Sequence, residues 1–384
     1  MLAYAFYESD GRVRMYAEAL AQRGDHVDVI SLQRDGRTPY ETINGVHVFR
    51  IQQRKIDEKG KVDYLWRLLK FLFNSTIFLT KKNMTARYDI IHVHSVPDFE
   101  VFATCFAKLT GAKIILDIHD IIPEFYASKF NANNQSLLFK TLVHIEKVSS
   151  IFADHVIAAN HIWEKTLTSR SVKKEKCTTF LNYPNTAMFH NKYSKNKNEQ
   201  FIIIYPGTLN KHQGVDIAIK AFALIKNDAP EAEIHIYGEG PDKPLLRRMV
   251  EDLNLQDRVL FRGLLSIQEI AHTIANADLG IVPKRNDFFG GEAFSTKILE
   301  FMALGIPVIV SATNIDKYYF NDSVVKFFKP EDEIDLARCM ISLIKNKNER
   351  EQLRENALNF VKQYDWHIRK QEYFHLVDSL VEKL

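Results

Sequence analysis

Residues 290–310 read Gly-Gly-Glu-Ala-Phe-Ser-Thr-Lys-Ile-Leu-Glu-Phe-Met-Ala-Leu-Gly-Ile-Pro-Val-Ile-Val. An apolar run at helical spacing ends at Gly305, and Pro307 follows two residues later, which is a helix stop. The run Val308-Ile-Val310 then predicts a buried strand. The segment is therefore expected to form a loop, a short helix that begins near Ser295, and a strand of a parallel sheet.

The expected helix start has the chemistry of an anion site. The backbone N–H groups of Phe294, Ser295 and Thr296 would point out of the first turn, where the helix dipole favours a diphosphate. Glu292 lies just before the helix and Glu300 eight residues later, and both could accept hydrogen bonds from hydroxyl groups. This combination suits a nucleotide sugar. An ordinary amphipathic helix with a solvated glutamate face is the alternative, although the preceding glycine pair favours close approach to a ligand.

Size and composition describe a two-domain protein without a nucleic-acid partner. The chain has 384 residues, of which 46% are hydrophobic and 26% charged, with a net charge of +3. This length predicts about two domains, and the small charge does not favour nucleic acid. Cys105, Cys177 and Cys339 match neither a metal-ligand spacing nor a disulfide framework, so we expect a reducing cytoplasm and no metal. The first expected strand leads straight into acidic and basic residues, so we also expect no signal peptide.

Short apolar strands alternate with helical patterns along the whole chain, which predicts parallel sheets covered on both faces. A polar stretch at 182–200 divides the strands into two series. The strands are expected at 3–7, 27–32, 46–51, 90–94, 113–118, 155–159, 178–181, 201–205, 233–237, 258–261, 279–282, 307–310 and 324–328. The fold class is thus α/β, with two Rossmann-like, doubly wound domains at 1–185 and 186–365 that would face a central cleft.

Residues 64–79 form the most apolar helical stretch of the first domain. The stretch is too short to span a membrane, and it contains Arg67 and Lys70. Its aromatic residues and flanking cations would suit a helix at a membrane interface. A core helix of the first domain is the alternative, and the sequence leaves both interpretations open.

In doubly wound sheets, ligands bind beyond the carboxyl ends of the strands. His119 follows such a strand and could bind a sugar hydroxyl or a phosphate. His92 and His94 alternate along another strand, so we expect only one to face the ligand, and His94 is nearer the strand end. After the first strand, Asp10 could cap a helix, and Arg12 could meet an anionic acceptor.

Several motifs resemble those of the retaining family-4 glycosyltransferases, which have the GT-B fold, in the family's order over nearly the full length. The most specific is the Glu-x7-Glu segment from Glu292, with Glu-Phe-Met-Ala-Leu-Gly-x-Pro-Val-Ile from Glu300. The other matches are Asp10-x-Arg-Val-Arg, Asp28-Val-Ile-Ser, Asp89-x-x-His-x-His, Asp117-x-His-Asp-x-x-Pro-Glu, Gly207, Tyr237-Gly-x-Gly-Pro and Arg258-Val-x-Phe-x-Gly. The resemblance also implies that the terminal helix, 366–384, crosses back onto the first domain.

The resemblance implies a nucleotide-sugar donor, such as a UDP- or GDP-sugar, with no other cofactor and no metal. Glu292 would contact the transferred sugar, His119 would reach that sugar or its phosphate, and Glu300 would bind the ribose. The other donor-side residues are Gly207, Thr208, Gln213, Gly240, Arg262, Phe294, Ser295, Thr296 and Lys297, and the acceptor-side residues are Asp10, Arg12 and His94. The implied acceptor is a glycan or a lipid-linked glycan, at the inner face of the cytoplasmic membrane.

One departure from the family pattern concerns the diphosphate. The family has Arg soon after the first glycine of the second domain and Lys five residues later, where this chain has Thr208 and Gln213. Lys211, Lys284, Arg285 and Lys297 are candidate replacements, and Lys297 is the first choice. A non-catalytic GT-B subunit that binds a nucleotide or a protein partner is therefore an alternative. A sugar-nucleotide epimerase of the same fold fits the carboxylate motif less well.

Overall fold

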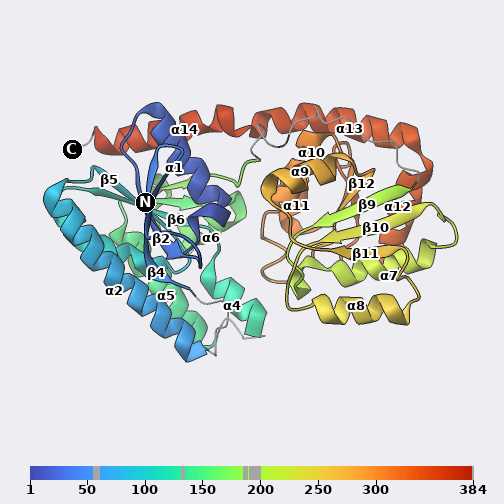
Figure 1. Cartoon of the computed structure of the whole chain (residues 1–384), viewed down its shortest axis with the longest axis horizontal. Helices are drawn as coiled ribbons and strands as arrows, with labels where there is room; N and C mark the ends of the chain where they lie inside the picture. Colours follow the sequence, from blue (N-terminus) through green and yellow to red (C-terminus); the bar gives the residue numbers. More distant parts are fainter. Residues whose placement is uncertain (55–60, 131–134, 185–188, 190–199, 383–384) are drawn as a thin grey trace. The chain divides into compact units, whose positions relative to one another are not determined.

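The computed structural model describes residues 1–54, 61–130, 135–184, 189 and 200–382 (Figure 1). The chain divides into two compact units: unit 1 comprises Met1–Asn182 and Lys370–Leu384, and unit 2 comprises Tyr183–Arg369. Most of the expected linker, 185–188 and 190–199, lies outside the described residues.

Unit 1 contains an eight-stranded sheet with the order β3-β4-β2-β1-β5-β6-β7-β8. Only the edge strand β3 runs antiparallel, paired with β4. The strands are β1 (Leu2–Ala3), β2 (Asp28–Gln33), β3 (Tyr40–Ile43), β4 (Val46–Gln53), β5 (Ile90–His94), β6 (Lys113–Ile118), β7 (His155–Ala158) and β8 (Cys177–Thr179). The sequence analysis missed β3, and it expected a longer first strand, whereas Tyr7–Ser9 forms a 3-10 turn, η1.

The helices of unit 1 start and stop where local chemistry allows. Asp10 accepts hydrogen bonds from the backbone N–H groups of Arg12 and Val13, and Gly24 closes the same helix at φ 105°. The helices are α1 (Gly11–Arg23), α2 (Lys61–Thr85), η2 (Asp98–Thr104), α3 (Cys105–Leu109), α4 (Ile122–Phe130), α5 (Leu137–Phe152), α6 (His161–Arg170) and η3 (Lys174–Lys176). Asp10 therefore has the capping role that the sequence allowed for it.

Unit 2 contains a six-stranded parallel sheet with the order β11-β10-β9-β12-β13-β14. Its strands are β9 (Phe201–Pro206), β10 (Ala232–Tyr237), β11 (Val259–Arg262), β12 (Leu279–Val282), β13 (Val308–Ser311) and β14 (Lys326–Phe328). Its helices are η4 (Lys211–Gln213), α7 (Val215–Ile225), α8 (Lys243–Asp252), α9 (Ile267–Ala275), α10 (Thr296–Leu304), α11 (Asn314–Tyr319), α12 (Glu333–Lys345), α13 (Lys347–Val361) and η5 (Lys362–Tyr364). The expected strand at the end of the quoted segment is β13.

The core of unit 2 has two parts because successive residues of a strand point to opposite faces of the sheet. On β9, Ile203 and Tyr205 pack with α7 and α12, whereas Ile204 packs with α9 and α10. Figure 1 shows helices on both sides of this sheet. Both units therefore have the doubly wound α/β architecture that the alternation of strands and helices predicted.

The last helix, α14 (Trp366–Val381), begins in unit 2, and its residues from Lys370 onward belong to unit 1. Tyr373 is fully buried in unit 1, where its ring lies 4.3 Å from that of Tyr16. Its hydroxyl lies 2.9 Å from Nδ1 of His92, and Asp378 forms an ion pair with Arg23. The end of the chain therefore completes the core of unit 1.

Candidate donor and histidine sites

The strand order of unit 2 identifies where a ligand should bind. In chain order, β10 and β11 are added to the sheet on one side of β9, and β12, β13 and β14 are then added on its other side. The order reverses between β9 and β12, and in such sheets ligands bind beyond the carboxyl ends of the strands at this switch point. The loops that follow these two strands, 207–214 and 283–292, are therefore the candidate donor loops.

The two donor loops are tied to each other by side chains. Arg285 donates two hydrogen bonds to Asp216, at 2.9 and 2.7 Å, and one to the carbonyl oxygen of Lys211 at 2.7 Å. His212 Nδ1 lies 2.7 Å from Asp287 Oδ2. Gly214 also approaches closely, since a Cβ there would lie 2.0 Å from the carbonyl oxygen of Pro283. Arg285 thus braces the loops, and its guanidinium is not free for a diphosphate.

The ammonium group of Lys284 is also bound by groups of the protein. Lys284 is only 3% exposed, forms a 3.0 Å ion pair with Asp316, and donates to the carbonyl oxygen of Ala293 at 2.7 Å. Asp316 is itself held by the hydroxyl of Thr313. Lys284 therefore positions the segment that leads into α10. The sequence analysis missed His212, Asp287, Thr313 and Asp316, because only the folded loops bring them to these partners.

The start of α10 leaves donor groups unused. Among the described residues, none accepts a hydrogen bond from the backbone N–H groups of Phe294, Ser295 or Thr296. The hydroxyl of Ser295 is buried and also lacks a partner there. Glu292 lies half-buried just before this turn. Unpaired N–H groups at a helix N-terminus can bind an anion. The diphosphate predicted at these residues stays a prediction.

Lys297 lies against the first glycine of unit 2. A Cβ on Gly207 would come within 2.3 Å of Lys297 Cε and 2.9 Å of Lys297 Nζ. The absence of a side chain at Gly207 therefore leaves room for the lysine between the two donor loops. Burial lowers the pKa of Lys297, with Glu300 opposing the shift. Of the cations proposed to replace the missing Arg and Lys, Lys297 is the one that the structure places against Gly207.

Glu300 follows Lys297 by three residues on α10, so that the two side chains can approach each other. Both are half-buried. Burial raises the pKa of Glu300 to about 7, and the nearby Lys297 ammonium partly offsets this rise. The carboxylate is therefore poorly solvated in the free protein, which is the condition in which hydroxyl donors of a ligand would stabilise it most.

The other predicted donor-side residues shape the loops. The hydroxyl of Tyr205 donates to the carbonyl oxygen of Thr208 at 2.9 Å and contacts Gln213 Oε1 at 3.2 Å. A Cβ on Gly240 would lie 2.1 Å from the carbonyl oxygen of Leu209, so this glycine permits loop-to-loop contact. Arg262 is exposed at the end of β11. Thr208 and Gln213 are thus neutral polar residues of a loop in which Lys211 is the lysine.

In unit 1, a fully buried carboxylate organises the predicted acceptor-side residues. Arg12 donates to both oxygens of Asp117 at 2.8 Å and to Asn182 Oδ1 at 2.9 Å. Arg12 is 5% exposed. This geometry corrects the predicted role of Arg12, because its guanidinium is committed to Asp117 and not presented to an anionic acceptor.

The histidines of β5 correct a second expectation. Residues two apart on a strand share a face, so His92 and His94 point the same way, and their rings stack with centroids 4.1 Å apart. Both are buried beside Asp117, with nitrogens 3.5 and 3.3 Å from Asp117 Oδ2. Burial and the neighbouring His92 lower the pKa of His94 well below its usual range. His94 is therefore an interior residue that contacts the accessible site only through His119.

His119 is the accessible end of this cluster, with a side chain that is 19% exposed. Its Nε2 lies 3.0 Å from His94 Nδ1 and 3.3 Å from Asp117 Oδ2. Burial would lower the pKa of His119, but the Asp117 carboxylate outweighs this effect and raises it. The arrangement presents an imidazole with a raised pKa at the carboxyl end of β6. Its predicted contact with a phosphate or a sugar hydroxyl stays a prediction.

His92, His94 and Asp117 also have the spacing of metal ligands, with donor atoms within 4.8 Å of one another. The sequence analysis did not anticipate this grouping. However, Arg12 already binds both oxygens of Asp117, and His92 Nδ1 contacts the hydroxyl of Tyr373. A second cation would be repelled by the guanidinium, so we interpret the group as a hydrogen-bonded cluster.

Replacing Asp117 with Asn should lower the pKa of His119, because the carboxylate is what stabilises the imidazolium. The variant should also lose about 3–5 kcal/mol of stability, since Arg12 would keep a buried charge without its partner. Proton NMR titration of the histidine ring signals and urea unfolding measure the two effects. Asp89→Asn, at an exposed carboxylate, is the control. An unchanged His119 pKa would show that Asp117 does not set its charge.

Comparison with known families covers most of the chain. Residues 11–182 match the family described as Glycosyl transferase 4-like domain, and residues 188–360 match Glycosyl transferases group 1. An uncharacterized glycosyltransferase of Haemophilus influenzae is 22% identical over 76% of this chain and 73% of its own length. The phosphatidylinositol N-acetylglucosaminyltransferase gpi3 subunit of Schizosaccharomyces pombe is 23% identical over 95% of this chain and 77% of its own.

Solved structures share the fold. Sucrose-phosphate synthase from Thermosynechococcus elongatus superposes with a TM-score of 0.81 at 19% identity, covering 100% of this chain and 99% of its own. Anabaena HepE in complex with UDP-glucose gives a TM-score of 0.75 at 15% identity and covers 98% of both chains. With the two family matches and the two doubly wound units, these similarities show that the chain belongs to the GT-B glycosyltransferases.

Proposed function

We propose that this chain is a retaining transferase that moves a hexosyl unit from a nucleotide-sugar donor to a glycan or glycolipid. The proposal places it in cell-surface polysaccharide synthesis, on the cytoplasmic side of the membrane. The observation that carries it is the first turn of α10, where three N–H groups without an acceptor among the described residues adjoin Lys297 and Glu300 at the switch point of unit 2. The UDP-glucose complex of the structurally similar HepE supports a donor of this class.

The proposed donor occupies the loops of unit 2. Its diphosphate accepts hydrogen bonds from the amides of Phe294–Thr296, and Lys297 adds the charge that Thr208 and Gln213 lack. Glu300 accepts from the ribose hydroxyls, and Glu292 from the transferred sugar. The resemblance places the base near Gly240, on the loop after β10, and Arg262, at the end of β11. The expected nucleotide is UDP or GDP.

The proposed reaction keeps the configuration at the anomeric carbon. The acceptor hydroxyl attacks on the face from which the diphosphate leaves, the bond from that carbon to the phosphate oxygen breaks, and the leaving oxygen takes the proton of the hydroxyl. The amides and Lys297 stabilise the negative charge that develops on the leaving group. Because protein groups supply this stabilisation, we propose that no metal is required. His119, whose pKa Asp117 raises, is proposed to contact the donor sugar or its phosphate.

A non-catalytic GT-B subunit remains the second candidate because of one specific observation. The loop from Gly207 carries Thr208 and Gln213 where the family has cations, and the hydroxyl of Tyr205 contacts the backbone carbonyl of Thr208 and Oε1 of Gln213. If Lys297 does not replace those cations, the nucleotide could bind without being turned over. Binding and turnover must therefore be measured separately.

Lys297→Met should lower turnover about a hundredfold, because a charged contact to the leaving group is worth on the order of 3 kcal/mol. Release of nucleotide from UDP- and GDP-sugars, with and without a lipid extract as acceptor source, measures this rate. Adding EDTA should leave the wild-type rate unchanged. Lys211→Met, on the exposed neighbouring loop, is the control.

A larger loss in Lys211→Met than in Lys297→Met would assign the compensating charge to Lys211. If the wild-type protein binds a nucleotide sugar but releases no nucleotide with any acceptor, the non-catalytic subunit would be the better description. Proton NMR of the product tests retention, since the anomeric signal should keep the configuration of the donor.

Donor affinity should fall as the pH drops below 7, because protonated Glu300 cannot accept two ribose hydrogen bonds. With the pKa of Glu300 at about 7, ionisation alone predicts about tenfold weaker binding at pH 6 than at pH 8. Calorimetry with intact UDP- and GDP-glucose measures this change, since their diphosphate does not titrate in this range. Glu300→Gln should flatten the profile, and an equally steep profile in that variant would assign the titration to another group.

A further inference from the structure

Helix α2 of unit 1 has two apolar faces, of which only one is used by the core. Leu68, Phe71 and Leu79 are buried, with exposures of 5%, 0% and 3%. On the opposite side, Trp66 and Phe73 are exposed to 67% and 64%. The core-helix interpretation of this segment therefore explains its inner face and leaves the outer face without a partner.

The outer residues form a continuous stripe. At 100° per residue, Trp66, Leu69, Phe73, Ile77 and Met84 fall within an arc of about 80°, and at 1.5 Å per residue they extend over about 27 Å. Leu69, Ile77 and Met84 are exposed to 44%, 39% and 72%. Exposed apolar surface that is contiguous over this length marks an interaction site more often than chance exposure.

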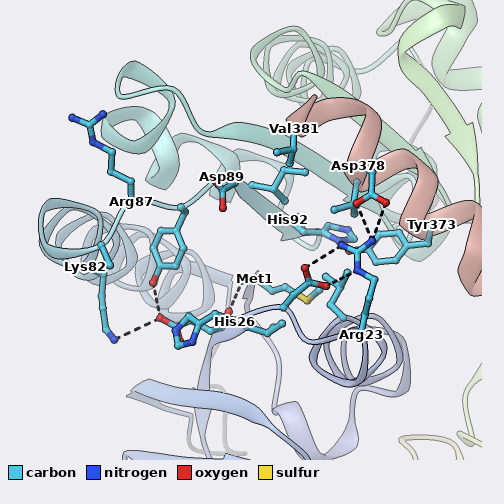
Figure 2. A pocket seen from close by; sticks show the side chains of 18 of the residues that line it. Met1, Arg23, His26, Lys82, Arg87, Asp89, His92, Tyr373, Asp378 and Val381 are labelled. Carbon is cyan, nitrogen blue, oxygen red and sulfur yellow. Dashed lines mark hydrogen bonds and ion pairs between the residues drawn. The ribbon is translucent and has the colours of Figure 1, made fainter. Parts of the chain in front are cut away.

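Positive charge accompanies the stripe. Residues 61–89 include six Lys or Arg and only two Asp. Arg67 is paired with Asp63, and Lys82 with Asp28. Lys70, Lys81 and Arg87 are exposed and form no ion pair with any residue that the structure describes. Figure 2 shows Lys82 turned toward its partner in a cavity of unit 1 that Arg87 also lines.

We infer that the outer face of α2 docks on an anionic lipid bilayer and lies in the plane of its interface. Apolar and aromatic residues on one face, with lysines beside them, are the features of helices that bind membrane surfaces. Unpaired cations match the negative potential of a cytoplasmic leaflet. No helix of the described residues is long and apolar enough to cross a bilayer. This inference rests on the proposed membrane location and identifies the surface that would contact the membrane. It involves no residue of the donor site.

Trp66 provides a direct reporter of docking. The other two tryptophans, Trp163 and Trp366, are 2% and 7% exposed, so quenchers within the bilayer should reach only Trp66. With vesicles that contain phosphatidylglycerol and a brominated phosphatidylcholine, we expect quenching and a blue shift of tryptophan emission. Vesicles of neutral phosphatidylcholine should give at least tenfold weaker binding, because two or three cations lose their attraction.

Variants of exposed residues separate the two contributions. Trp66→Ser with Phe73→Ser should weaken sedimentation with anionic vesicles more than tenfold, since two large apolar side chains no longer enter the interface. Lys70→Glu with Lys81→Glu should weaken it about tenfold or more at low salt and less at high salt. Leu224→Ser with Leu245→Ser is the matched control, because these leucines are 56% and 63% exposed on unit 2.

The inference is overturned if the wild-type protein does not bind anionic vesicles, if the Trp66 and Phe73 variant binds as well as the control, or if Trp66 is not quenched. The inference is also overturned if light scattering shows that the wild-type protein is a dimer and that this variant is a monomer. That result would assign the face to a second copy of the chain. Nucleotide binding is measured on the same samples without lipid. A loss of vesicle binding with nucleotide binding intact thus separates failure of the surface from failure of the proposed function.

Discussion

The first turn of α10 is the constraint on which unit 2 depends. A helix cannot satisfy its own first N–H groups, and in this chain no described residue satisfies those of Phe294–Thr296. The surrounding loops keep this turn open through strong contacts of their own, because Lys284 is held by Asp316, and Arg285 by Asp216. An anionic ligand is the group that best completes such a turn, so the fold of this unit and its proposed chemistry have the same physical origin.

Unit 1 differs, because its central buried charge, the carboxylate of Asp117, already has partners within the protein. Asp117 is fully buried, and although burial would raise its pKa, Arg12 and His119 hold that pKa well below its usual value. The carboxylate in turn raises the pKa of His119 and holds its ring at the accessible edge of the cluster. An imidazole held in this way loses little conformational freedom when it binds a ligand, so the buried cluster positions a partly exposed residue.

The sequence predicted the parts of the protein that depend on local pattern. The doubly wound sheets, the start of α10 near Ser295 and the cap at Asp10 follow from periodicity and capping chemistry. Local pattern could not decide which of Lys211, Lys284, Arg285 and Lys297 replaces the missing cations. Lys284 is neutralised by Asp316 and Arg285 by Asp216, and both partners lie far away along the chain. The burial of Arg12 was missed for the same reason, since Asp117 is 105 residues away. The edge strand β3 was missed because alternating exposure along four residues is a weak signal.

The central claim is that the start of α10, with Glu300, binds a nucleotide diphosphate. Calorimetric titration of the purified protein with UDP, GDP, ADP and their common sugar conjugates, without metal, tests it most directly. The account predicts micromolar affinity for one nucleotide base and loss of that affinity in Glu300→Ala. Failure of every nucleotide to bind, or undiminished binding by Glu300→Ala, would contradict it.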